Sequence, residues 1–475
     1  MDVIDKHNVS HVEDAIPPSK VEVDGYQYTP NTPEEKRLVR KIDRHLLPML
    51  WLMYVFNYLD RTNIGNAKVG GMQKDLKLTS SDYSLVLSIF FVGYLLNEVP
   101  CNLILARSKP RIFLPCVMLA WGAMSIGAKG VTSLGGMVAF RFFLGIVEAG
   151  FFPGVMLVMS CWYKPREMSK RIALFYTASL VSGAFGGLLA GGIIDGLEGV
   201  GGTRGWKWLF IIEGLITVAI ASVAFFVLPN YPTNTGWLSD SEKDLAVARL
   251  AVGQEQGTDI SHKAAFISAI KDPKTWVFLF IYNVINSVGT ISYFFPTLMT
   301  SLGYTGRKAQ FMTVPIYIVA LVISVGMGFN SDRTGQKAFH VLAACAWGIA
   351  SFIIVVAVHN NAVRQVRNSK TSHRWALYAF ICFGGAAIWS AVPILLSWIV
   401  TMFEGRSKRA TSIALINGFG NLSSVYGSFF WPASDAPRYI PGFCVTISLM
   451  AFGAVLVALA KWRYQDRGFE GVPKR

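Results

Sequence analysis

The stretch RFFLGIVEAGFFPG, residues 141–154, carries an arginine and a glutamate seven residues apart. Because seven residues are about two turns of an α-helix, Arg141 and Glu148 share one face, roughly 10 Å apart along the axis at ~1.5 Å per residue. They lie in an apolar run, residues 137–162, that is long enough to cross a bilayer. Leaving one charge at the bilayer centre costs about 2.5 to 3.5 kcal/mol on insertion scales. We therefore expect this face to meet a polar cavity or charged partners; the alternative is an ion pair that only fastens helices together.

The composition is that of a polytopic membrane protein. Of the 475 residues, 52% are hydrophobic and only 15% are charged. The formal net charge is +15, but the basic residues cluster between apolar runs, where they act as topology signals, so we expect no nucleic-acid partner. The six cysteines lie within or at the ends of apolar runs without CxxC spacing. This pattern predicts neither disulfides nor a metal site, and we expect no cofactor.

Twelve apolar segments, each near the ~20 residues of a spanning helix, predict an all-α membrane protein made of two six-helix halves. A polar stretch with Pro, Gly and many charges separates the halves. We predict a disordered cytosolic tail, an N-terminal six-helix bundle, a cytosolic linker with room for one short surface helix, a C-terminal six-helix bundle and a second cytosolic tail, at residues 1–35, 36–229, 230–272, 273–467 and 468–475.

Twelve spans place both termini on one side of the membrane, and the distribution of Lys and Arg predicts that this side is the cytoplasm. One loop disagrees with this orientation, because it would place four basic residues outside: Arg364, Arg367, Lys370 and Arg374. We expect a multi-pass protein of the plasma membrane with both termini cytoplasmic.

The two halves resemble copies of each other. MSKRIALFY, residues 168–176, opens the fifth span, and RSKRATSIA, residues 406–414, opens the eleventh. Two helix-shaping residues of the fourth span recur in the tenth, at an offset of 240 residues. Paired bundles around a midplane site are typical of transporters, because rocking of two rigid bodies gives alternating access.

The first span contains NYLDRTN, which places Asn57, Asp60 and Arg61 near its outer end. The fourth span runs back inward, so Arg141 lies at a similar depth and Glu148 lies nearer the midplane. If these spans are neighbours, Asp60 can pair with Arg141, or Arg61 with Glu148. The alternative for Arg61 is a side chain that reaches the outer interface.

None of the seven histidines falls in the middle of a span, so proton coupling would depend on carboxylates. A carboxylate beside an arginine stays charged, whereas desolvation favours the neutral form. A group that alternates between these environments can load and release a proton. We predict Glu148 and Asp60 as the coupling residues, ahead of Glu98 and Glu213, for which fastening of helices is the stronger expectation.

The C-terminal half has no carboxylate deep inside a span, but two of its helices carry polar stripes. Such side chains can recognise a polar solute or fasten helices by hydrogen bonds, and both roles stay open. As substrate-binding candidates, beside Asn57, we take the neutral residues Asn283, Asn286, Tyr293, Asn417 and Asn421.

The loop GFNSDRTGQK, residues 328–337, joins the eighth and ninth spans. Its spacing predicts a tight turn whose carboxylate can bind helix ends or basic side chains, in a gating role. The residues concerned are Gly328, Asp332, Arg333, Gly335 and Lys337.

These residues resemble the major facilitator superfamily, whose signature loop is matched at 328–337 and poorly matched at ARSKPRI, residues 106–112. FNYLDRTNIGNA, RFFLGIVEAGFFPG and GWKWLFIIEG resemble the anion:cation symporter branch, in particular the fungal allantoate permease family. The resemblance implies proton-coupled movement of a carboxylate, ureido acid or vitamin. It also implies coupling by Asp60 and Glu148 and an anion facing Arg61 and Arg141. The glycine-proline motif of antiporters is missing from SGAFGGLLAGG in the fifth span.

The sequence thus predicts a monomeric secondary transporter, not an enzyme, that imports a small organic anion with protons. An exporter of a secondary metabolite is the alternative within this class, and a membrane nutrient sensor without transport is the alternative outside it. A membrane enzyme would need a nucleophile or metal set, and none is recognisable in the sequence.

Overall fold

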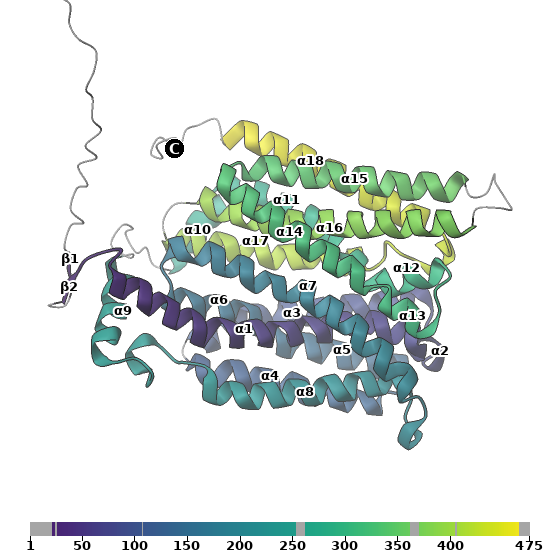
Figure 1. Ribbon diagram of the computed structural model, residues 1–475, viewed down its shortest axis with the longest axis horizontal. Helices are drawn as coiled ribbons and strands as arrows, with labels where there is room; N and C mark the ends of the chain where they lie inside the picture. Colours follow the sequence, from purple (N-terminus) through teal and green to yellow (C-terminus); the bar gives the residue numbers. More distant parts are fainter. Residues whose placement is uncertain are drawn as a thin grey trace, which may run out of the picture.

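The computed structural model describes residues 21–23, 26–106, 108–252, 262–361, 370–403 and 406–464. Long helices run side by side along the molecule, and the two halves of the chain form neighbouring groups (Figure 1). The first group contains α1 (Pro33–Ala67), α3 (Ser80–Ala106), α4 (Pro110–Gly127), α5 (Leu134–Glu148) with α6 (Phe151–Trp162), α7 (Pro165–Gly196) and α8 (Gly205–Val227).

The second group repeats six crossings, some of them built from several pieces. It contains α11 (Pro273–Val288) with η5 (Gly289–Phe294) and α12 (Phe295–Ser301), α13 (Gly306–Phe311) with α14 (Val314–Thr334), α15 (Lys337–Asn361), α16 (Lys370–Met402), α17 (Arg406–Gly427) and α18 (Ile440–Tyr464). Short elements join the crossings: η1 (Lys68–Met72), α2 (Gln73–Asp75), η2 (Ala128–Gly130), η3 (Val200–Gly202) and η6 (Ala433–Asp435).

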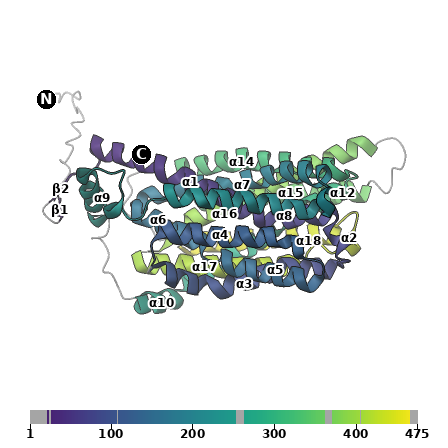
Figure 2. The ribbon, with the colours of Figure 1, turned by 90° about the horizontal axis from the view of Figure 1, so that it is seen from below.

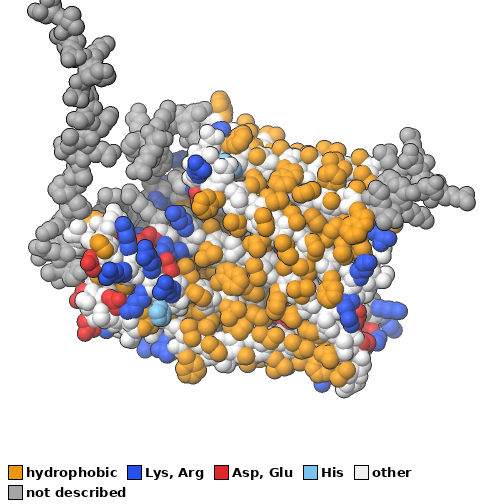
Figure 3. All heavy atoms as spheres, in the orientation of Figure 1, with side chains coloured by type: hydrophobic (Ala, Val, Ile, Leu, Met, Phe, Trp, Pro, Cys, Tyr) orange, Lys and Arg blue, Asp and Glu red, His pale blue; other side chains and the backbone are white. Residues whose placement is uncertain are grey.

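Nine helices within the described part of the chain are long and apolar enough to cross a membrane. The other three crossings, α1, α3 and α17, run beside them through the bundle (Figures 1 and 2). The side of the bundle seen in Figure 3 is mostly apolar along its middle, and Lys and Arg gather towards its two ends. Phe226, Phe329 and Trp462 are each more than two-thirds exposed, which fits side chains that face lipid. The prediction of an all-α membrane bundle with twelve spans is confirmed.

We call the end where α1 begins and α18 ends the terminal face, and the end where α1 stops the opposite face. Several hydrogen bonds between the two halves lie towards the opposite face. Ser84 Oγ donates to the Ser428 carbonyl over 2.8 Å, and Gln310 Nε2 donates to the Asn66 carbonyl over 3.2 Å. The Arg307 backbone donates to Asp195 over 3.0 Å. The bundle is therefore closed at the opposite face.

The predicted tail and linker differ from the structure. β1 (Val21–Val23) and β2 (Tyr26–Tyr28) form an antiparallel pair, Tyr28 is buried, and α1 already begins at Pro33. Disorder is therefore a wrong expectation for residues 26–35, and residues 1–20 lie outside the described part. The linker holds η4 (Pro232–Asn234) and two helices in place of one, α9 (Asp240–Val252) and α10 (His262–Lys271).

Helix α9 is attached to the N-terminal half by charge. Arg249 is fully buried and donates to Glu35 over 3.1 Å and to Glu167. Lys164 reaches the same Glu35 oxygen over 2.5 Å. Burial alone would favour the neutral carboxyl, but hydrogen bonds from Lys164, the Asn31 backbone, Tyr28 and Arg249 outweigh it and lower the pKa of Glu35 to about 2. The first half of the linker therefore belongs to the N-terminal bundle.

The loop at 328–337 forms the predicted tight turn. Helix α14 ends at Thr334, and Gly335 follows in the left-handed conformation with φ 68°. Lys337 donates to Ser397 of α16, over 3.0 Å to its carbonyl and 2.6 Å to its hydroxyl. Asp332 and Arg333 are exposed, and Gly328 lies inside α14. The gating role of these residues stays a prediction. In the basic loop that disagrees with the predicted membrane orientation, Arg364 and Arg367 lie outside the described residues.

Candidate functional site

The central ion pair joins α1 to α5. Arg61 Nε donates to Glu148 Oε2 over 2.8 Å, and Asn57 Nδ2, one turn earlier on α1, donates to the same oxygen over 3.1 Å. Glu148 is fully buried and Arg61 is 9% exposed. Of the two pairings predicted from depth, the structure contains this one. Pro153 has no backbone N–H for the carbonyl of residue 149, and α5 accordingly ends directly after Glu148.

The other predicted pairing, Asp60 with Arg141, is wrong. Asp60 accepts hydrogen bonds from Trp121 over 3.1 Å, Thr217 over 3.3 Å and Ser125 over 3.4 Å, so it faces α4 and α8. Consecutive residues of a helix point about 100° apart, since one turn takes 3.6 residues. Asp60 and Arg61 therefore cannot both face α5, and depth alone could not decide which of them does.

Arg141 is fully buried without an acidic partner in direct contact among the described residues. Its Nε donates to the Val86 carbonyl over 3.4 Å, and its guanidinium lies 4.5 Å from the centre of the Phe90 ring. Both Nη atoms have no hydrogen-bond partner within the described part of the chain. A buried guanidinium with free donors is costly in isolation, so these two Nη atoms are candidate donors to an anion.

A second polar layer lies farther along α1, towards the opposite face. Asn63 donates to Glu213 of α8, and Asn66 Nδ2 donates to Asn63 Oδ1 over 3.0 Å. Glu213 is fully buried. The contact attaches α1 to α8, which agrees with the expected fastening role. Glu98 stands apart on α3 and faces Gly418 of α17, where an added Cβ would lie 3.4 Å from its Oε2.

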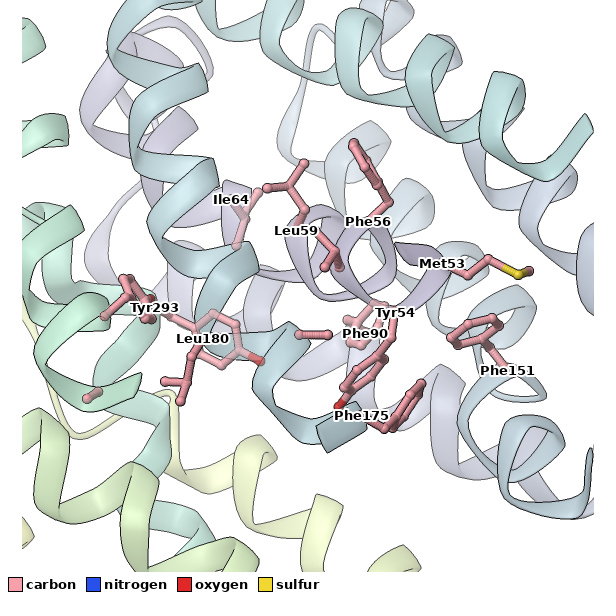
Figure 4. Close-up of a cluster of buried hydrophobic side chains, with 14 of the residues drawn as sticks. Met53, Tyr54, Phe56, Leu59, Ile64, Phe90, Phe151, Phe175, Leu180 and Tyr293 are labelled. Carbon is pink, nitrogen blue, oxygen red and sulfur yellow. The ribbon is translucent and has the colours of Figure 1, made fainter. Parts of the chain in front are cut away.

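Aromatic side chains surround the central pair, and the sequence reasoning missed them. Tyr54 stacks on Phe175 with ring centroids 4.2 Å apart, and Tyr58 meets Trp389 of the other half at 5.7 Å. Figure 4 shows Tyr54 and Phe175 lying against each other. The signal was present in the sequence, because Tyr54 and Tyr58 are four residues apart, one turn before Asn57 and Arg61 respectively.

The polar stripes of the C-terminal half form a seam between α11 and α17. Asn283 Nδ2 donates to the Phe419 carbonyl over 2.7 Å, and Asn286 Nδ2 donates to the Gly420 carbonyl over 3.0 Å. Tyr282 donates to Asn417 over 3.4 Å. These three contacts correspond to the predicted alternative in which the polar stripes fasten helices to each other. The substrate-binding role of this set stays a prediction.

Two further members of that set are placed differently. Asn421 is half-buried on α17. Tyr293 is buried in η5 at the contact between the halves, where its carbonyl accepts from Tyr83 over 3.4 Å. A Cβ added at Gly65 of α1 would lie 2.5 Å from this carbonyl, so glycine allows α1 and η5 to meet.

The described residues contain no group of three His, Cys, Asp or Glu side chains placed to hold a metal ion. The site combines the buried Glu148 carboxylate paired with Arg61, a second arginine, Arg141, with free donors, and neighbouring aromatic rings. These groups suit the binding of an organic anion and the exchange of a proton, because either event changes how the buried charges are balanced.

Comparison with known proteins agrees with this fold. The model of the Major Facilitator Superfamily matches residues 50–428. The MFS-type transporter cnsO of Penicillium expansum is 36% identical over 440 residues, covering 90% of this chain and 83% of that protein. The major facilitator-type transporter hxnP of Emericella nidulans is 30% identical over 427 residues, covering 88% and 83% respectively.

Two solved structures share the fold at low sequence identity. A bacterial homolog of the human lysosomal transporter Spinster, in an inward-facing and occupied conformation, has a TM-score of 0.66 and 15% identity, covering 93% of this chain and 100% of that one. A D-xylose-proton symporter has a TM-score of 0.64 and 16% identity, covering 88% and 97%.

Proposed function

Since the chain belongs to the Major Facilitator Superfamily, whose model matches residues 50–428, we propose that this transporter is a symporter that moves a small organic anion together with protons. The anion is a carboxylate, a ureido acid or a vitamin. The observation that carries the proposal is the buried Arg141, whose Nη atoms have no partner in the described part of the chain, close to the Arg61–Glu148 pair.

In the proposed mechanism, Glu148 holds Arg61 while its carboxylate is charged. Protonation of Glu148 weakens this bond, because a neutral carboxyl no longer balances the guanidinium. Arg61 and Arg141 are then both available to the anion. The anion neutralises the buried arginines while the proton neutralises Glu148, so a loaded site has a lower cost of burial than a half-loaded one. Asp60 is a second coupling carboxylate in this scheme.

Transport in liposomes tests the proposal. The full chain is reconstituted with an imposed pH gradient and offered a panel of labelled carboxylates. We expect accumulation to follow the gradient and to fall at least tenfold in Glu148→Gln, while exchange of labelled for unlabelled anion persists. Arg141→Gln should abolish both accumulation and exchange. Glu198→Gln, at an exposed carboxylate, is the matched control.

Uptake that ignores the gradient in the wild-type protein would contradict proton coupling. Coupling that is unchanged in Glu148→Gln would contradict the assigned role of this residue. Uptake of neutral solutes in preference to every carboxylate of the panel would contradict the anion as substrate.

The proposal also places the protein in the plasma membrane as a monomer, with the terminal face in the cytoplasm. Exposed basic side chains of the terminal face, including Arg37, Arg40 and Arg44, support this orientation, because cytoplasmic segments are enriched in Lys and Arg. An epitope at either terminus should be reached by antibody only after intact cells are permeabilised. Labelling of intact cells would contradict the orientation.

A further inference from the structure

Lys68 is a buried cation at the closed end of the bundle. It is 7% exposed and lies where α1 passes into η1, a π-helical segment in which Gly71 has φ 107°. Its Nζ is 4.1 Å from the centre of the Tyr83 ring on α3 and 5.3 Å from that of Phe294 in η5. Lys68 and Tyr83 belong to the N-terminal half and Phe294 to the C-terminal half, so this cation–π cluster spans the contact between the halves.

Among the described residues, no carboxylate oxygen lies within 4.0 Å of Lys68 Nζ. Other basic groups at the opposite face do have acidic partners: Arg204 contacts Asp75 and Glu198, and Arg307 contacts Asp195. Holding an ammonium that is largely buried without a carboxylate partner is costly, and a methionine would fill the same space at lower cost. The charge therefore weakens the closed state and gains hydration when the gate opens.

We infer that Lys68 is an anion-capture residue at the gate of the opposite face: its ammonium rests on Tyr83 and Phe294 while the halves are in contact and faces the entering organic anion when they separate. This inference rests on the proposed function for the class of solute. It assigns to Lys68 the first contact with the anion and to the deeper arginines, Arg61 and Arg141, the final one.

The geometry makes the exchange of partners direct. Phe294 moves with the C-terminal half, so separation of the halves at this face removes one of the two rings that cover Nζ. Tyr83 stays with Lys68, and its hydroxyl loses the Tyr293 carbonyl that accepts from it over 3.4 Å. The ammonium is then a free donor at the entrance with no neighbouring carboxylate to compete with the anion.

The local potential can be measured without knowing the solute. Ser292 is buried in η5 and lines a small cavity between the halves with Thr62, Asn66 and Thr313. In Ser292→Cys, the rates of reaction with 2-sulfonatoethyl and 2-trimethylammonioethyl methanethiosulfonate are compared, with both reagents added on the side of the opposite face. The ratio of the two rates cancels the frequency of gate opening and reports the sign of the charge at the entrance.

We expect Lys68→Met to lower the ratio of anionic to cationic reaction roughly fivefold or more, since one charge acts on both reagents with opposite sign. Lys68→Arg should keep the ratio, and Lys77→Met, at an exposed lysine of the same face, should change it little. The chain without the Ser292→Cys change gives the background from the six native cysteines.

An unchanged ratio in Lys68→Met would overturn the inference, and so would an equal change in Lys77→Met. Lys68→Arg keeps the charge, so a loss of the ratio there as well would show that the effect came from altered packing and would also overturn it. The ratio depends neither on proton coupling nor on the transported solute. It can therefore fail while the proposed symport holds, and it can succeed while symport fails.

Discussion

The two halves share one architecture but keep their buried polar groups in different ways. Within the described ranges, every buried Asp, Glu, Lys and Arg precedes residue 250, and the buried polar residues after it are Ser, Thr, Gln and His. The N-terminal half balances charge against charge, as in Arg61 with Glu148. The C-terminal half joins amides to backbone carbonyls along the seam of α11 and α17. The first arrangement has a charge balance that a proton or an anion would change, whereas the contacts of the second join helices by neutral hydrogen bonds.

The comparison predicts that breaking the central pair has the largest effect. Arg61→Ala leaves Glu148 charged and buried without its partner, which costs about 3 to 5 kcal/mol. Adding Glu148→Gln should recover part of the loss, because the unpaired charge disappears. Thermal unfolding of the purified single and double variants measures this. A double variant less stable than the sum of both single changes would contradict a pairwise role.

The second-largest difference between the halves should come from how closely their helices pack. In Gly145→Ala, the new Cβ would lie 2.0 Å from the Phe90 carbonyl, and backbone cannot move aside without separating α5 from α3. We expect a loss of about 1 to 3 kcal/mol. The matched change in the C-terminal half, Gly384→Ala, meets the Phe352 ring at 2.5 Å, and a side chain can turn away. Equal losses of unfolding temperature in both variants would remove this part of the contrast.

The α11–α17 seam should be less sensitive. Asn286→Ala removes hydrogen bonds to the Gly420 carbonyl and the Ser423 hydroxyl, and bonds of this kind inside membranes average about 0.6 kcal/mol each. We expect folding and transport to survive with a small fall in unfolding temperature. Loss of anion exchange in a variant that folds normally would instead assign Asn286 to the solute, the other role predicted for it.

The last prediction concerns the attachment of α9 and its dependence on pH. The pKa of Glu35 is lowered to about 2 from its ordinary value of 4.5, so its contribution to stability is complete above about pH 4.5 and is lost as the pH falls towards 2. Between pH 7 and 5 we expect no change in unfolding temperature from this residue. Glu35→Gln should flatten the acid limb of the profile, whereas Glu34→Gln, at an exposed neighbour, should not. An unaltered acid limb in Glu35→Gln would contradict the assignment.

Much of the site was predictable, for identifiable reasons. Arg61, Arg141 and Glu148 could be recognised because charges inside apolar runs are rare and costly. The direction of Asp60 could not be predicted, because it depends on which neighbour each face of α1 meets. The aromatic surround was passed over because Tyr and Phe in spanning helices usually face lipid or core, and only the contact between Tyr58 and Trp389 distinguishes these rings.

The sequence by itself determined the number of spans, the doubled architecture and which half of the chain holds the buried charges. These features follow from the cost of placing each residue type in a bilayer. Only the tertiary structure decided which charges pair, that Arg141 keeps free donors, and that Lys68 is covered by rings from both halves. Such pairings depend on how helices are rotated against one another, and that rotation is set by packing between residues far apart in the sequence.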